Sequence, residues 1–173
     1  MSCNVPKTDK KRVVIVGGGF GGLKLAQKLK KSNYQVVLID KNNYHQFPPL
    51  IYQVASSGIE PSSIAFPFRR LFQRRKDFYF RLAEVKSIHA TEKIIQTSIG
   101  KLSYDYLVLA AGTTTNFFGN TQVEENAIPM KTLSESMGLR NALLDNFERA
   151  LTCTSPQEKQ ELLNIVIVGG GAT

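Results

Sequence analysis

A glycine-rich loop between two apolar runs constrains the fold of this chain more than any other feature. Residues 12–16 form an apolar run that leads directly into Gly17, Gly19 and Gly22, which fill the glycine positions of the pattern G-x-G-x-x-G. Residues after Gly22 have helical spacing, and a second apolar run covers residues 36–39. This order of strand, loop, helix and strand predicts a βαβ unit of the kind that binds a dinucleotide.

Each part of this unit has a chemical role if a diphosphate binds there. Gly17 allows the tight turn, Gly19 lets the pyrophosphate approach the backbone, and Gly22 lets helix and strand pack closely. The helix would turn its first amides and its positive dipole end towards the diphosphate. Asp40 ends the second run at about the 20-residue spacing of the carboxylate that binds a ribose hydroxyl. The unit predicts FAD or NAD, whose adenosine ribose is unphosphorylated; the alternative is a purely structural glycine turn followed by a solvated acid.

A second loop of the same kind follows the apolar run 165–168, with glycines from Gly169 to Gly171. Two such loops indicate two dinucleotides side by side, as in an electron-transfer flavoprotein, with structural glycines as the alternative. The sequence ends at Thr173, before the helix, the third glycine and the acid of a complete site. We therefore expect an incomplete second site and a fragment of a longer reading frame.

Composition favours a soluble α/β protein. The chain has 173 residues, 42% of them hydrophobic, and no apolar run approaches the ~18 residues of a membrane span. The polar N-terminus lacks a signal-peptide core, so we expect a cytoplasmic chain. Cys3 and Cys153 do not have C-x-x-C spacing, which argues against both a redox disulfide and a zinc site.

The net charge is +8, and the positive charge is not spread evenly, because five cations lie within residues 69–76. These five cations are interleaved with apolar side chains: Arg69, Arg70, Arg74, Arg75 and Lys76. A solvated helix face is the simplest interpretation, an anionic membrane surface is the second, and nucleic acid is the last. We expect no nucleic-acid partner.

The middle of the chain has short strand-like segments at residues 78–80, 83–88, 94–97 and 101–104, with Gly100 at a hairpin turn. We expect them to form a small antiparallel sheet beside the parallel one. An apolar strand over residues 106–113 then ends in small residues, which leave room for a ligand. Capping patterns at Thr132 and Ser155 predict a long helix and a shorter one before the second loop.

The order of these motifs resembles that of the type II NADH dehydrogenases, the single-subunit NADH:quinone oxidoreductases. The similar stretches are both glycine loops and residues 38–45, 49–55, 83–85 and 104–112. The resemblance covers nearly the whole chain and is most specific between Tyr44 and Ala55.

This resemblance implies a doubly wound, Rossmann-like α/β fold. Residues 1–130 would be the first part of an FAD-binding domain with a small antiparallel sheet, and residues 131–173 would be connecting helices and the first strand of an NAD-binding Rossmann domain. The residues implied to contact FAD are Gly17, Gly19, Phe20, Gly21, Gly22, Asp40, Lys41, His45, Phe47, Val85, Ala111 and Gly112, and those implied to contact NAD are Gly169 and Gly171. Pro48 stands where many members have Gln, which puts one polar contact near the flavin in doubt.

The resemblance also implies an activity for the full-length protein. Hydride would pass from NADH to FAD, and two electrons would then pass to a membrane quinone. C-terminal helices beyond this sequence would attach the protein to the cytoplasmic face of the inner membrane, and a homodimer is one option for the full-length form. Two other interpretations stay open. A ferredoxin reductase or a sulfide:quinone reductase shares both loops, the latter with catalytic cysteines, and a non-catalytic nucleotide-binding module is the remaining class.

Overall fold

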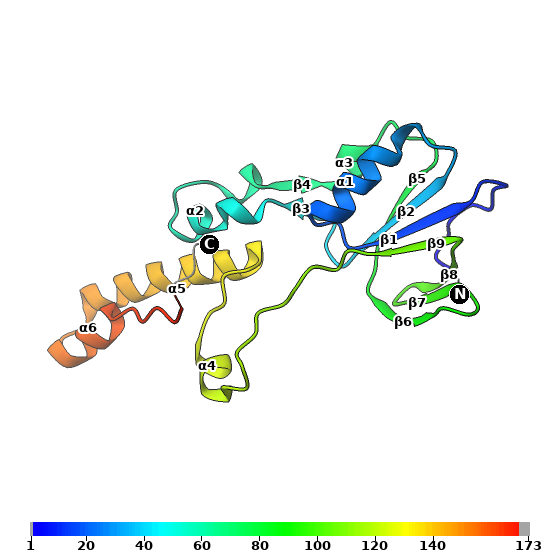
Figure 1. The fold of residues 1–173 in the computed structure, drawn as a ribbon. Coiled ribbons are helices and arrows are strands. Elements are labelled where there is room, and N and C mark those ends of the chain that lie inside the picture. The colour runs from blue at the N-terminus through cyan, green and yellow to red at the C-terminus, as the bar shows by residue number, and fades with distance from the viewer. Residues whose placement is uncertain (1, 170–173) are drawn as a thin grey trace. The chain divides into compact units, whose positions relative to one another are not determined.

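The computed structural model describes residues 2–169, which divide into two compact units (Figure 1). The first unit contains the residues up to Gln46 together with Phe66–Thr113, and the second contains Phe47–Ala65 and the residues from Thr114 onward. The predicted boundary between an FAD-binding part and a connecting part at residue 130 concerns function, and it stays a prediction.

The first unit is built on a parallel sheet of four strands in the order β5-β2-β1-β9. These strands are β1 (Arg12–Val16), β2 (Gln35–Asp40), β5 (Phe78–Leu82) and β9 (Tyr106–Leu109). As the sequence predicts, a helix connects β1 to β2; it consists of α1 (Phe20–Lys28) and the short 3-10 helix η1 (Leu29–Lys31). From β1 the chain winds to one side through β2 and β5, and β9 adds to the other side. The α/β class with a doubly wound parallel sheet is confirmed.

Both faces of this sheet are covered, as Figure 1 shows for the first unit. Successive side chains of a strand point to opposite faces. On one face, Ile15 and Leu38 pack in a buried cluster with residues of α1 and of α3 (Phe68–Phe72). On the other face, Val14 and Val37 pack against the small sheet. Because both faces are buried, the central strands are apolar without interruption, which is typical of parallel sheets.

The small sheet is antiparallel and consists of β6 (Val85–His89), β7 (Ile94–Thr97) and β8 (Gly100–Ser103). Gly100 has a φ of 128° at the hairpin turn, as predicted. The assignment of residues 78–80 to this sheet is wrong, because β5 pairs in parallel with β2, with Phe80 opposite Leu38. Phe80 is buried against Phe68 of α3, and this long-range packing, which the local pattern does not contain, favours the parallel position.

The chain passes between the units through two short paired strands, β3 (Tyr44–Gln46) and β4 (Ala65–Pro67). Between them lie the helix α2 (Ile51–Ala55) and two 3-10 turns, η2 (Pro48–Leu50) and η3 (Pro61–Ser63). Each 3-10 turn begins at a proline, whose fixed φ suits the first position of a helix.

In the second unit, α2 packs against the long helix α5 (Leu133–Thr152). Ser136 of α5 is fully buried, and its hydroxyl donates to the carbonyl oxygen of Ile51 at 2.7 Å. The capping box predicted at Thr132 and Glu135 is present. Helices α4 (Thr121–Asn126) and α6 (Pro156–Leu163) begin at the side-chain caps Asn120 and Ser155.

The strand expected over residues 165–168 is not formed. The four side chains are between 57% and 84% exposed, and no described strand pairs with them. A strand needs neighbours that take its backbone hydrogen bonds, and an apolar run alone does not supply them. The first strand of the predicted NAD-binding domain is therefore not observed.

Candidate dinucleotide-binding site

The first glycine loop lies at the edge of the parallel sheet where the strands end. Val16, the last residue of β1, is opposite Ile39 of β2 and Leu109 of β9. The residues that follow these three strands therefore meet at one edge. The winding of the chain reverses between β1 and β9, and open parallel sheets bind ligands at such a switch point.

Close backbone packing explains two glycines of the loop. Gly17 has a φ of 100°, in the left-handed region, and a Cβ atom there would collide with the carbonyl group of Ala110. A Cβ atom on Gly22 would collide with the carbonyl oxygen of Gly17. This second contact is the close approach of helix and strand predicted for the third glycine of the pattern. Both obstacles are backbone atoms, so a side chain at either position would displace the loop.

Gly18 is held on three sides, although the sequence pattern does not single it out. Its N–H donates to Oδ2 of Asp40 at 2.6 Å, and its carbonyl oxygen is 2.9 Å from Nδ1 of the buried His45. A carbonyl oxygen only accepts, so Nδ1 is the protonated nitrogen in this bond. A Cβ atom on Gly18 would overlap the ring of Phe68, which is fully buried. Phe68 comes from α3, far along the sequence, and no local signal could have indicated this contact.

The start of α1 has the features of a diphosphate site. No side chain caps this helix at Gly19, its N-cap residue. A Cβ atom on Gly19 or on Gly21 would meet no atom within 4 Å, so the space beside the loop is open. The first amides of a helix lack partners within the helix and bind anions readily. The residues present therefore fit the diphosphate of a dinucleotide.

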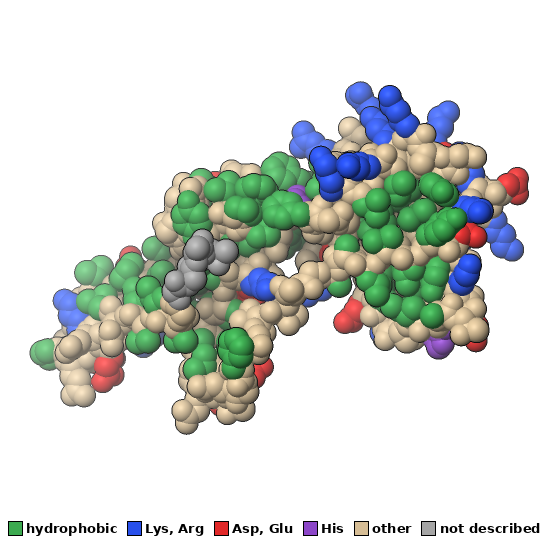
Figure 2. Space-filling model, in the orientation of Figure 1, with side chains coloured by type: hydrophobic (Ala, Val, Ile, Leu, Met, Phe, Trp, Pro, Cys, Tyr) green, Lys and Arg blue, Asp and Glu red, His purple; other side chains and the backbone are tan. Residues whose placement is uncertain are grey.

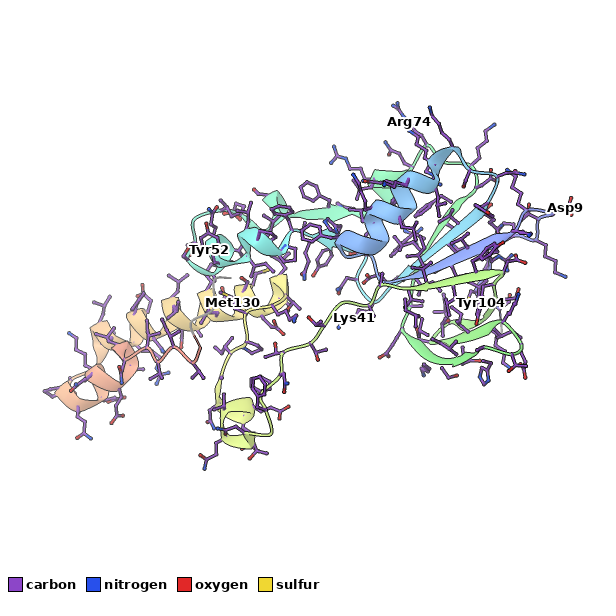
Figure 3. The ribbon with its side chains drawn as sticks, viewed as in Figure 1. Asp9, Lys41, Tyr52, Arg74, Tyr104 and Met130 are labelled. Carbon is purple, nitrogen blue, oxygen red and sulfur yellow. The ribbon has the colours of Figure 1, made fainter. Side chains whose placement is uncertain are left out.

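Asp40 is the last residue of β2, and Lys41 follows it at the same edge. The two carboxylate oxygens of Asp40 accept from the N–H groups of Gly18 and Asn42, at 2.6 and 2.8 Å. A carboxylate has about four acceptor positions, so capacity remains for a ribose hydroxyl. Lys41 is exposed beside it (Figure 3). The arrangement fits the predicted ribose contact and adds a second role, because Asp40 also anchors the loop.

Three other predicted residues lie near this edge by connectivity. Ala111 and Gly112 follow β9 and are exposed, and Gly112 has a φ of 73° with open space where a Cβ atom would be. Val85 begins β6 and packs half-buried on the small-sheet side of the core. The N–H of Ala83 donates to the carbonyl oxygen of Asp40 at 2.9 Å, which ties the segment before Val85 to the end of β2. Their contacts with a cofactor stay predictions.

The structure brings His45 to the loop but leaves its predicted flavin contact untested. The His45 ring lies against that of Phe20, with centroids 5.5 Å apart and planes at 60°. Phe20 is half-exposed at the start of α1. Phe47 belongs to the second unit, where its N–H donates to the carbonyl oxygen of Ile64 at 2.9 Å. The buried position of His45 indicates a structural role in addition to any contact with a cofactor.

Of the second glycine loop, Gly169 lies within the described residues and Gly171 lies outside them. Gly169 has a φ of 97°, a conformation that suits the tight turn of a nucleotide loop. The NAD contacts implied for both glycines stay predictions.

The environments of the two cysteines do not favour a nucleophilic thiolate. Cys3 is buried, with its thiol 3.3 Å from the Thr97 hydroxyl. The Cys153 thiol donates to a carboxylate oxygen of Glu158, and this hydrogen bond raises the pKa of the thiol. Because the thiolate is the reactive form, a raised pKa lowers the reactivity of Cys153.

Comparison with known proteins defines the class to which the chain belongs. The model of the pyridine nucleotide-disulphide oxidoreductase family matches residues 11–173, and the chain is a member of this family. The type II NADH:quinone oxidoreductase Ndh of Mycobacterium tuberculosis is 36% identical over 166 residues, which are 94% of this chain and 36% of the relative.

Solved structures show the same relationship. NDH2 from Plasmodium falciparum, solved in complex with NADH, matches with a TM-score of 0.81 and 26% identity, over 88% of this chain and 32% of that one. The sulfide:quinone oxidoreductase of Aquifex aeolicus matches with a TM-score of 0.72 and 28% identity, over 80% and 32%. The chain thus spans about a third of the length of these relatives. The resemblance to type II NADH dehydrogenases is confirmed.

Proposed function

We propose that this chain binds FAD at the loop of residues 17–22, and that the protein it represents is an NADH:quinone oxidoreductase. The family and the relatives named above support FAD and NAD(H) as the two cofactors. The observation that carries the proposal is the convergence of the glycine loop, the start of α1 and Asp40 at one edge of the parallel sheet.

In this proposal, the described residues hold and orient the cofactor. Amides at the start of α1 bind the diphosphate, and Gly19 leaves its approach free of a side chain. Asp40 accepts from a ribose hydroxyl while its bond to Gly18 keeps the loop in place. FAD, when bound, supplies the hydride and electron chemistry between NADH and the quinone.

The variant Gly19→Ala should weaken binding of the diphosphate without affecting the fold. The φ of Gly19 is −64°, which alanine adopts freely, and the added methyl group enters open space. The methyl group would stand where the pyrophosphate approaches, so we expect FAD binding at least about tenfold weaker, the equivalent of one lost charge-assisted hydrogen bond. Titration of FAD fluorescence with the chain measures this affinity.

Gly138→Ala is the matched control, because its methyl group also meets no atom within 4 Å and Gly138 lies on α5. This variant should bind FAD as the parent chain does. Equal affinity of Gly19→Ala and the parent would contradict binding at this loop, and so would a colourless parent chain that cannot be reconstituted with FAD.

Sulfide:quinone reduction is the second candidate activity, favoured by the Aquifex aeolicus match. The identity of 36% to the relative Ndh, against 28% to the Aquifex aeolicus protein, favours NADH as the electron donor. Quinone reduction by the full-length protein with sulfide in place of NADH distinguishes the two, and we expect activity with NADH alone.

We also propose that the full-length protein is peripheral on the cytoplasmic face of the membrane that holds its quinone. The names of the relatives support a quinone as the acceptor. Within residues 2–169, no helix combines the length and the apolar character needed to cross a bilayer. Fractionation of membranes with and without high salt would test this peripheral attachment. A full-length homodimer stays a prediction.

A further inference from the structure

A basic cavity of about 370 Å³ lies where the end of α1 meets α3 and the turn after it. Its volume is within the range of small-molecule pockets. Four cations line it, together with two glutamines and two apolar residues, and no acidic side chain does: Lys30, Arg70, Arg74 and Arg75. Figure 2 shows Lys and Arg side chains gathered over this part of the first unit.

Arg75 already has partners within the protein. Its guanidinium donates to the carbonyl oxygens of Ala26 and Leu29, at 2.5 and 3.2 Å, and lies over the ring of Phe78 with its carbon 5.0 Å from the centroid. Carbonyls at the end of a helix lack partners within the helix, and a cation there offsets the negative end of the dipole. Arg75 therefore stabilises the end of α1 and holds one wall of the cavity in place.

The other three cations that line the cavity are not needed to neutralise the end of α1, because Arg75 already binds the carbonyl oxygens there. Lys30, Arg70 and Arg74 are exposed, and none of them takes part in an ion pair within residues 2–169. Like charges around one cavity repel one another, and a bound anion would replace this repulsion with attraction. The surplus of charge therefore points to an anionic ligand.

We propose that this cavity binds a phosphoryl group. Guanidinium groups bind phosphate oxygens in pairs, and a lysine adds a compact charge. Leu71, which is 42% exposed, also lines the cavity and offers contact to an apolar part of a ligand. Two sources carry this chemistry, the headgroup of an anionic phospholipid and a soluble polyphosphate.

The cavity is separate from the dinucleotide site and independent of the proposed function. Helix α1 has nine residues and is about 13 Å long, with the glycine loop at its start and Lys30 beyond its end. In Figure 3, Arg74 lies at the upper edge of the first unit and Lys41 lies towards its lower left side. An anion bound here would therefore be additional to FAD.

A charge-matched pair of double variants tests the cavity. Arg70→Gln with Arg74→Gln removes two cations of the cavity, and Lys86→Gln with Lys101→Gln removes two exposed cations from the small sheet. The soluble probe is inorganic tripolyphosphate, followed by calorimetry. The lipid probes are phosphatidylcholine vesicles with and without phosphatidylglycerol, followed by co-sedimentation.

The parent chain should bind tripolyphosphate or the phosphatidylglycerol vesicles, and the probe that binds identifies the source. The arginine variant should bind at least about tenfold more weakly, while the lysine variant binds as the parent does. FAD binding, measured separately, should be equal in all three chains. A chain that does not bind FAD would therefore contradict the proposal for the glycine loop and not the proposal for the cavity.

An equal loss of probe binding in both double variants would show that only the net charge of the chain matters, and it would overturn the proposal. Binding of neither probe by the parent, or binding of duplex DNA alone, would overturn it as well.

Discussion

The N–H of Gly18 donates to the carboxylate of Asp40 at 2.6 Å, and this bond joins the glycine loop to the end of the neighbouring strand. The acid that the sequence assigns to a cofactor ribose therefore also binds the backbone that would hold the diphosphate. If the dinucleotide binds as proposed, this hydrogen bond would couple recognition of the ribose to recognition of the diphosphate.

Asp40→Ala should weaken FAD binding by about 1–3 kcal/mol, the scale of hydrogen bonds to a charged group. The overall fold should persist, because Asp40 lies at the sheet edge and is only half-buried. Asp40→Asn keeps an acceptor oxygen for Gly18 and should lose less affinity. Equilibrium dialysis against FAD measures the affinity of the parent chain and of both variants. Equal affinity in all three would show that Asp40 is a solvated residue at a strand end without a role in FAD binding.

Gly18→Ala should destabilise the chain by roughly 1–3 kcal/mol, because its methyl group would overlap the ring of Phe68 in a close-packed core. Phe68→Leu removes the far end of that ring. The double variant should therefore lose less stability than the sum of the two single variants. Urea unfolding of the four proteins gives the coupling energy, and strict additivity would show that the ring does not limit position 18.

Arg75→Gln should destabilise the chain by about 1–3 kcal/mol, since it removes a charged donor from two helix-end carbonyls. Arg74→Gln, the adjacent exposed cation, should stay within roughly 0.5 kcal/mol of the parent. Thermal unfolding of both variants provides the comparison. Similar losses in the two would mean that general charge, and not the contact with α1, determines stability here.

The 173-residue chain alone should oxidise NADH no faster than free flavin does. Hydride transfer needs the nicotinamide within about 3–3.5 Å of the flavin in a fixed orientation. After Gly169, four residues remain in this sequence, too few for the helix whose amides would bind the second diphosphate. Stopped-flow mixing of the FAD-loaded chain with NADH, read as flavin bleaching, tests this, and rapid bleaching would contradict it.

Local sequence patterns predicted the elements whose signals are local. The first βαβ unit, the hairpin at Gly100 and the capping box at Thr132 all follow from residues close together in the chain. The placement of β5 did not, because Phe80 packs against Phe68 of α3 and only this contact favours the parallel sheet. The apolar run 165–168 has the composition of a strand, but no strand within residues 2–169 pairs with it.

In the candidate site, too, the sequence predicted what depends on local spacing and did not predict what depends on long-range contacts. Spacing alone placed Gly17, Gly22 and Asp40 at one edge of the sheet. The sequence could not show that Gly18 is limited by an aromatic ring from α3, or that its carbonyl oxygen binds His45 of β3. These contacts join residues that are distant in the chain, and short motifs do not include them.

The contacts around Gly18 have a consequence for the kinetics of flavin exchange. A loop whose N–H, carbonyl oxygen and Cα are each fixed by the protein has little conformational freedom left to lose when a ligand arrives. The loop then loses little conformational entropy when the flavin binds, and no slow rearrangement of the loop needs to precede binding. Association should follow simple second-order kinetics, and differences in affinity among variants that keep these contacts should reside in the residence time of the flavin.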